Sequence, residues 1–302
     1  FKTYLGSIID DKVWKGIAEG LNYGLGFMVI FMLHFTVATK QPAMTAARFA
    51  EAVEKTPQGK SVNMKLAQLL VDVFRSQSIA VLGNVLIAMG LAALIAFGYQ
   101  YKTGEPLMNA DQIAYQLHSI DPFAGTLWFA AIAGVWLFCS GIISGYFDNR
   151  SNYLNMRMRL TQHPLLKKLM SEKTRVKFAN YMHENYGSLI GNLCFGMLLG
   201  ITGVVGYLTH LPLDIRHVAF SSANVGYIAV SGQFTYSLLL QCIGFVLLIG
   251  LVNLVVSFSL TLWVALRSLN AEIESWWPIW HEVCQIVKKR PLSLFLPVQL
   301  DK

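Results

Sequence analysis

The residues best suited to chemistry lie together in one short segment, Leu211-Pro-Leu-Asp-Ile-Arg-His217. It brings the carboxylate of Asp214, the guanidinium of Arg216 and the imidazole of His217 into four positions. These groups could bind an anion or relay protons. In an extended segment the side chains of Asp214 and Arg216 share one side. The alternative is an Asp–Arg ion pair that fixes the segment onto the neighbouring helix ends.

Further polar side chains accompany this segment in stretches that are otherwise apolar. Charged and polar groups that enter a helical membrane bundle are candidates for function, although a single such group more often only forms a hydrogen bond between helices. Asn192 and Asn253 lie on neighbouring apolar stretches and could face one cavity. The candidate substrate-binding residues are therefore Asp214, Arg216, His217, Ser221, Ser222, Asn224, Asn192 and Asn253.

The common catalytic and metal-binding patterns are missing from the sequence. There is no Gly-x-Gly-x-x-Gly, P-loop, Gly-x-Ser-x-Gly or His-Glu-x-x-His motif. The four cysteines are widely spaced without a Cys-x-x-Cys pair, and the acids, apart from the adjacent Asp10 and Asp11, are scattered singly. We therefore predict no catalytic residue, metal or cofactor.

These candidates must be positioned by the run Val218 to Leu266, which holds 49 residues without a charged side chain. About 20 apolar residues already cross a bilayer as a helix, and 49 residues would make ~73 Å of helix against ~30 Å of hydrocarbon. We therefore divide the run at Ser231-Gly232. Residues 218–231 are too short to cross, so we expect them to be re-entrant or buried between helices.

Composition agrees with a membrane protein: 54% of the residues are hydrophobic, only 14% are charged, and the mean hydropathy is +0.47. We predict an all-α, polytopic helical membrane bundle that forms a single domain over residues 1–302. Its five spans are expected at about 16–38, 78–99, 123–147, 186–209 and 234–266. An amphipathic helix is expected at 63–75, with Lys65, Gln68, Asp72 and Arg75 on one stripe.

Glycine recurs in two of these spans. Gly16, Gly20 and Gly24 lie four residues apart in the first span, a spacing that allows close helix packing. In the fourth span, glycines occupy most of one side of the predicted helix. This side could pack tightly against a neighbouring helix or line a cavity. Its glycines are Gly187, Gly191, Gly196, Gly200, Gly203 and Gly206.

Lysine and arginine counts give the orientation. Residues 40–75, 148–185 and 267–302 carry six, eight and five basic residues and are assigned to the cytoplasm, including the C-terminus. Residues 100–122 and 210–233 carry one each and are assigned outside. This places residue 1 outside, which is natural if an upstream part of the same protein precedes it.

The segment 148–185 is strongly basic and is expected to form two or three helices broken at His163-Pro164. Its basic side chains could contact anionic lipid or nucleic acid, with lipid favoured because the positive-inside rule already accounts for the charge. The candidates for this contact are Arg150, Arg157, Arg159, Lys167 and Lys168.

Three stretches carry a family resemblance: Ala38-Thr-Lys-Gln-Pro-Ala-Met-Thr-Ala46, Gly145-Tyr-Phe-Asp-Asn-Arg150 and Leu211 to Asn224. They resemble the bacterial transmembrane proteins that are called site-specific recombinases. The resemblance extends from the first span to the last. It implies the membrane-embedded C-terminal half of such a protein, in the bacterial inner membrane.

The family's name does not fit the residues. A tyrosine recombinase needs an arginine three positions after a histidine, and none of the seven histidines has one. The leading hypothesis is therefore binding or translocation of a small polar or lipid-like substrate. A membrane-tethered DNA recombination protein and a non-catalytic membrane scaffold stay open. Expected partners are membrane lipids and the upstream part of the same protein; a homo-oligomer is left open, and nucleic acid is disfavoured.

Overall fold

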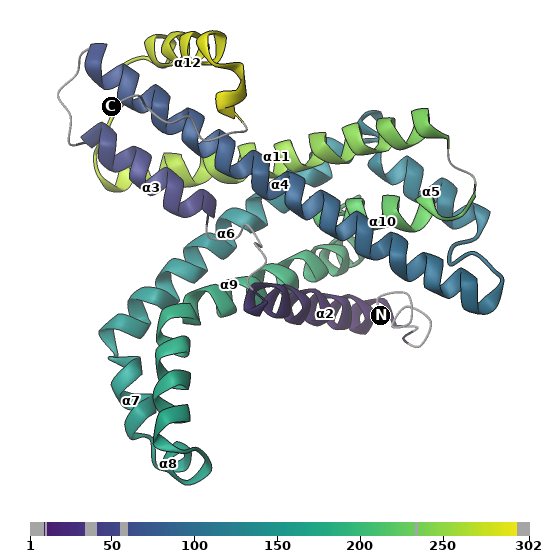
Figure 1. Cartoon of the computed structure of the whole chain (residues 1–302), viewed down its shortest axis with the longest axis horizontal. Helices are drawn as coiled ribbons and strands as arrows, with labels where there is room; N and C mark the ends of the chain where they lie inside the picture. Colours follow the sequence, from purple (N-terminus) through teal and green to yellow (C-terminus); the bar gives the residue numbers. More distant parts are fainter. Residues whose placement is uncertain (1–8, 10, 34–40, 55–59, 233–234, 295–302) are drawn as a thin grey trace. The chain divides into compact units, whose positions relative to one another are not determined.

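The computed structural model describes residues 9, 11–33, 41–54, 60–232 and 235–294. All regular structure in these residues is helical, as the sequence predicts. Among the described residues, four helices are long and apolar enough to cross a membrane: α4 (Lys60–Thr103), α6 (Thr126–Tyr153), α9 (Glu172–Thr209) and α11 (Tyr236–Ser268) (Figure 1). Together they indicate an integral membrane protein.

The chain divides into two compact units. Unit 1 comprises residues 1–43 and 136–214, and unit 2 comprises residues 44–135 and 215–302. Each unit is described by itself, so the predicted single domain stays a prediction. Helix α6 (Thr126–Tyr153) contributes its first part to unit 2 and its second part to unit 1.

Unit 1 contains α2 (Lys12–Met32), α7 (Met156–Gln162), α8 (Pro164–Leu169) and α9 (Glu172–Thr209) beside the second part of α6. The first predicted span, 16–38, coincides with α2 as far as Met32, and its residues 34–38 lie outside the described ones. The predicted break at His163-Pro164 is confirmed, since Pro164 begins α8. However, the predicted fourth span is not separate from the basic segment, because α9 runs through both.

The glycines of α2 and α9 form the packing face of unit 1. A Cβ added to Gly196 would overlap the backbone of Gly24, and one added to Gly200 would overlap the backbone of Gly20. The expected close packing of the glycine-spaced helix is therefore confirmed. Elsewhere on α9, Gly187 and Gly191 face α6 and Gly206 faces Leu213, whereas Gly203 has open space around it. This glycine face is thus mainly a packing face rather than the lining of a cavity.

Unit 2 contains α4 (Lys60–Thr103), α5 (Ala110–Ile120), the short 3-10 helix η1 (Pro122–Ala124), α10 (Val218–Ala229) and α11 (Tyr236–Ser268). It also contains α12 (Trp277–Lys289), the 3-10 helix η2 (Pro291–Leu294) and all but the first three residues of α3 (Gln41–Glu54). Two apolar clusters hold it together. One joins α4, α5, α6, α10 and α11, and the other joins α3, α4, α11 and α12.

Two expectations for unit 2 need correction. The amphipathic helix 63–75 and the span 78–99 are one helix, α4, because no helix-breaking residue separates them. Its polar stripe is nevertheless present, since Asp72 accepts from Gln68 at 3.2 Å and pairs with Arg75 at 2.9 Å. The predicted loop 100–122 contains α5, whose start is fixed by a reciprocal capping box between Asn109 and Gln112.

The division of the charge-free run is confirmed. Helix α10 ends at Ala229, and Gly232 adopts a positive φ of 76° that ends the segment before α11. With 12 residues, α10 spans only ~18 Å, too short to cross a bilayer. It packs closely on α4, because a Cβ on Gly226 would overlap the carbonyl oxygen of Met89.

Candidate ligand-binding site

The candidate residue Arg216 is anchored within unit 2. Its Nε donates to the carbonyl oxygen of Ser119 at 2.7 Å, and its guanidinium lies 5.6 Å from the ring centre of Phe129. Ser119 is in the last turn of α5, where carbonyl oxygens lack helical partners and a positive charge is favourable. Arg216 therefore holds the C-terminal end of α5 in place.

Asn253 of α11 joins three other segments of unit 2. Its Nδ2 donates to the carbonyl oxygens of Ala130 at 2.7 Å and Arg216 at 3.0 Å. Its Oδ1 accepts from the amide of Val218 at 3.2 Å, which satisfies a free donor at the start of α10. Asn253 is only 2% exposed. We call these residues, Asn253, Arg216, Ala130 and Val218, the asparagine latch.

The other candidates near α10 also bond within the protein. Ser222 donates to the carbonyl oxygen of Val218 at 2.6 Å, and Asn224 donates to Oε1 of Gln116 at 2.7 Å. Ser221 is buried in the same helix. His217 precedes α10 and meets Phe220 edge-on, with 5.7 Å between ring centres. Burial lowers the pKa of His217 to about 4, so the imidazole is neutral at neutral pH.

Two candidates belong to unit 1. Asp214 is its last residue, and Arg216 lies in unit 2, so their proposed ion pair stays a prediction. Asn192 is fully buried on α9, while Asn253 is buried in the other unit. A shared cavity between these two asparagines also stays a prediction. The described structure does bring Arg216, Val218 and Asn253 together. They bond to one another and to backbone groups, so they hold segments of unit 2 in place rather than form an open binding site.

The basic candidates are exposed on one part of unit 1. Arg150 lies near the end of α6, Arg157 and Arg159 lie on α7, and Lys167 and Lys168 lie on α8. Within the described residues, no group of three or more His, Cys, Asp or Glu side chains could hold a metal ion.

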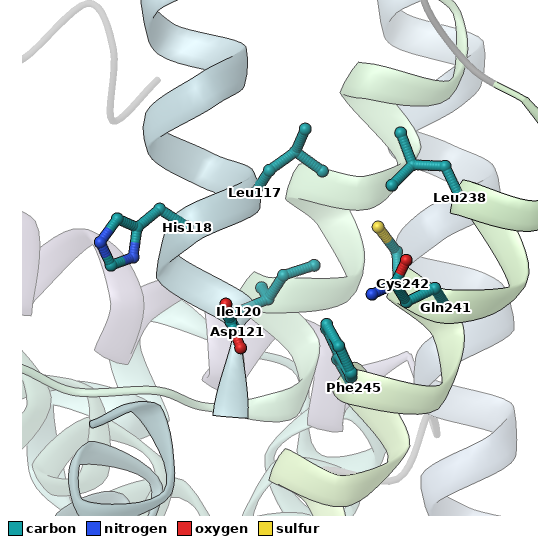
Figure 2. A pocket seen from close by; sticks show the side chains of 8 residues that line it. All are labelled: Leu117, His118, Ile120, Asp121, Leu238, Gln241, Cys242 and Phe245. Atoms are coloured by element: carbon teal, nitrogen blue, oxygen red, sulfur yellow. The ribbon is translucent and has the colours of Figure 1, made fainter. Parts of the chain in front are cut away.

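A pocket of about 280 Å³ lies between α5 and α11 in unit 2. Figure 2 shows Leu117 and Ile120 projecting from α5 toward side chains of α11, while the ring of His118 projects away from α11. Asp121 stands at the end of α5, where its carboxylate also caps η1 by accepting from the amide of Phe123 at 3.0 Å. The α11 side of the pocket is lined by Leu238, Gln241, Cys242 and Phe245.

Gln241 is the distinctive residue of this pocket. It is exposed in the first two turns of α11, where the residues on either side of it are apolar, and its amide makes no hydrogen bond with any residue that the structure describes. An amide facing hydrocarbon without a partner costs several kcal/mol, of order 2–7. The sequence contains a signal for this residue, because Gln241 is a lone amide in the first turns of a predicted span. The sequence alone could not show that it lies beside α5.

Residues 1–297 match the sequence family described as site-specific recombinase. The chain belongs to this family. The match confirms the resemblance carried by the three quoted stretches and covers both units. No curated protein matches the chain. No solved structure matches it either.

Proposed function

We propose that this membrane protein of the site-specific recombinase family binds a lipid-like molecule in the pocket between α5 and α11. The exposed amide of Gln241 carries the proposal, because it lies on an apolar helix beside apolar walls and lacks a protein partner among the described residues. A ligand with a polar head and an apolar tail would satisfy both the amide and the apolar walls formed by Leu117, Ile120 and Phe245.

The size of the pocket limits the ligand. Pockets for small molecules usually measure about 300–1,000 Å³. At about 280 Å³ this one fits part of a molecule, such as a headgroup with the first carbons of its chains. The remainder of the chains would continue along α11, where Leu240 is 71% exposed.

Binding at this site is favoured over translocation. Asn253, the buried amide of α11, bonds to protein groups through both its oxygen and its nitrogen, so it offers no open polar site to a passing substrate. The glycines of α9 mostly contact neighbouring segments of unit 1. We place the pocket on the outer side of a bacterial inner membrane, from the lysine and arginine counts.

Native mass spectrometry of the full chain, released from membranes in mild detergent, tests the proposal. Leu238→Trp should fill the pocket, and Gln241→Leu should remove its polar partner; each should lower lipid occupancy about tenfold, the equivalent of one hydrogen bond to the ligand. Leu240→Trp is the matched control, because this neighbouring residue does not line the pocket. Equal occupancy in Leu238→Trp and Leu240→Trp, or no retained lipid in the parent chain, would overturn the proposal.

The family's description favours a second candidate function, a membrane-tethered protein that recombines DNA. Its test is incubation of the purified chain with supercoiled plasmid. Cleavage that disappears on substitution of a single tyrosine or serine would establish this function and displace lipid binding as the principal activity.

A further inference from the structure

The basic part of unit 1, residues 148–185, forms a protruding arm of the end of α6, α7, α8 and the start of α9 (Figure 1). We call it the basic arm. Between Arg150 and Lys177 it carries eight lysines and arginines against one acid, Glu172. Because most of these basic side chains are exposed, the arm presents a concentrated positive charge.

The tip of the arm also exposes large apolar side chains. Leu165 is 61% exposed and Leu169 is 78% exposed. They lie four residues apart on α8, so they share one face, and Lys168 lies beside them. A face that combines leucine and lysine in this way suits a membrane interface, where the leucines enter the acyl boundary and the lysine stays at the headgroups.

The direction of the arm follows from a bend in α9, which is plain in Figure 1. Two side chains at the end of α6 bond to the backbone of α9: Asp148 accepts from the amide of Gly187 at 3.1 Å, and Ser151 donates to the carbonyl oxygen of His183 at 3.3 Å. An undistorted α-helix pairs this amide with this carbonyl. Insertion of side chains into the helical hydrogen bonds is a recognised cause of a kink.

Gly187 is needed at this place, because a Cβ there would overlap the carboxylate of Asp148. Residues 187–209 contain no charged side chain and are the part of α9 suited to crossing the bilayer. The bend turns the basic arm away from the line of that crossing part. The arm therefore leaves the axis of the crossing part at an angle, as contact with the membrane surface requires.

We propose that the basic arm docks on an anionic lipid surface, with Leu165 and Leu169 inserted among the headgroups and Lys167 and Lys168 beside lipid phosphates. This binding surface is separate from the pocket between α5 and α11. Nucleic acid would also attract the positive charge, but it would leave the two leucines in water. The apolar tip thus favours lipid as the occupant.

Hydrogen–deuterium exchange of the full chain in nanodiscs tests this docking. The discs contain phosphatidylcholine alone, or phosphatidylcholine and phosphatidylglycerol at roughly 3:1, which supplies an anionic surface. Amides of residues 156–171 should exchange about tenfold more slowly in the anionic discs, and raised salt should reduce this protection because it screens the charge.

Two double variants locate the contact. Lys167→Gln with Lys168→Gln should abolish the lipid-dependent protection, since each lysine near an anionic surface changes binding about fivefold. Leu165→Gln with Leu169→Gln should weaken it in both salt conditions. The matched control is Lys288→Gln with Lys289→Gln, an exposed lysine pair at the end of α12, which should leave residues 156–171 unchanged.

The parent chain alone can overturn the proposal. Equal exchange of residues 156–171 in the two kinds of disc would do so. Protection that arises only when duplex DNA is added to phosphatidylcholine discs would identify nucleic acid as the occupant instead. Protection by anionic lipid that persists in the Lys167 and Lys168 variant would exclude the assigned face.

Discussion

Unit 1 and unit 2 both pack apolar helices, but they join them mainly through different atoms. In unit 1, α2 and α9 meet where glycines bring their backbones together, at Gly20 with Gly200 and Gly24 with Gly196. In unit 2, the short helix α10 is held by the asparagine latch, through side-chain hydrogen bonds to backbone groups. The comparison indicates that a segment where the helical backbone is interrupted needs polar side chains as hydrogen-bond partners. A continuous helix can be held by close packing alone.

The physical reason lies in the backbone. A continuous helix satisfies its own amides and carbonyls, so close packing is enough to hold it in an apolar environment. The start of α10 and the end of α5 expose backbone groups that cannot bond within their helices. Asn253 and Arg216 supply the missing partners, which accounts for a buried amide and an anchored guanidinium in an otherwise apolar region.

The largest effect is expected from Asn253→Leu. This change removes three hydrogen bonds at once and leaves the amide of Val218 without its partner, so we expect a loss of about 3 kcal/mol of unfolding free energy. Unfolding of the full chain in mixed micelles measures it. Asn84→Leu, an asparagine on α4 that takes no part in the latch, should cost less than about 1 kcal/mol. Equal losses of unfolding free energy in the two variants would show that the asparagine latch does not stabilise unit 2.

A glycine pair on α9 tests the contrasting mechanism in unit 1. Gly200→Ala places a methyl group against the backbone of Gly20 and should cost about 2 kcal/mol through overpacking. Gly203→Ala, on the same helix, has no atom within 4 Å of its new methyl group and should stabilise the helix by up to about 1 kcal/mol. Both are measured in the same unfolding assay. The same sign for both variants would contradict packing by close backbone approach.

Sequence reasoning recovered what depends on local pattern. The helical class, the break at Pro164, the division at Gly232 and the packing role of Gly20 follow from hydrophobicity and backbone chemistry. The helix ends were less accessible, because α4 and α9 continue from polar into apolar sequence without interruption.

The candidate site depended on contacts distant in sequence. Asn253 reaches Ala130 across 123 residues, and Arg216 reaches Ser119 across 97. Residue type identified both as polar groups in an apolar setting but could not reveal their partners. The pocket was missed for the same reason, because the residues of α5 that line it with Gln241 lie more than a hundred positions away from it in the sequence.

The last expected effect is a difference in pH dependence between the two units. His217 is buried beside the latch, and burial lowers its pKa to about 4 from the usual 6.5. As pH falls below 6.5, the unfolded state binds a proton before the folded state does, so stability is full above that pH and declines toward pH 4. Between about pH 7 and pH 5 the loss of unfolding free energy should be about 2 kcal/mol.

The glycine contacts of α2 and α9 contain no titrating group. Hydrogen exchange at pH 5 should therefore accelerate in α10 more than in α2, after correction for intrinsic rates, and His217→Gln should remove the difference. If α2 and α10 loosen equally, or if the His217→Gln chain keeps the acid response of α10, another group controls it.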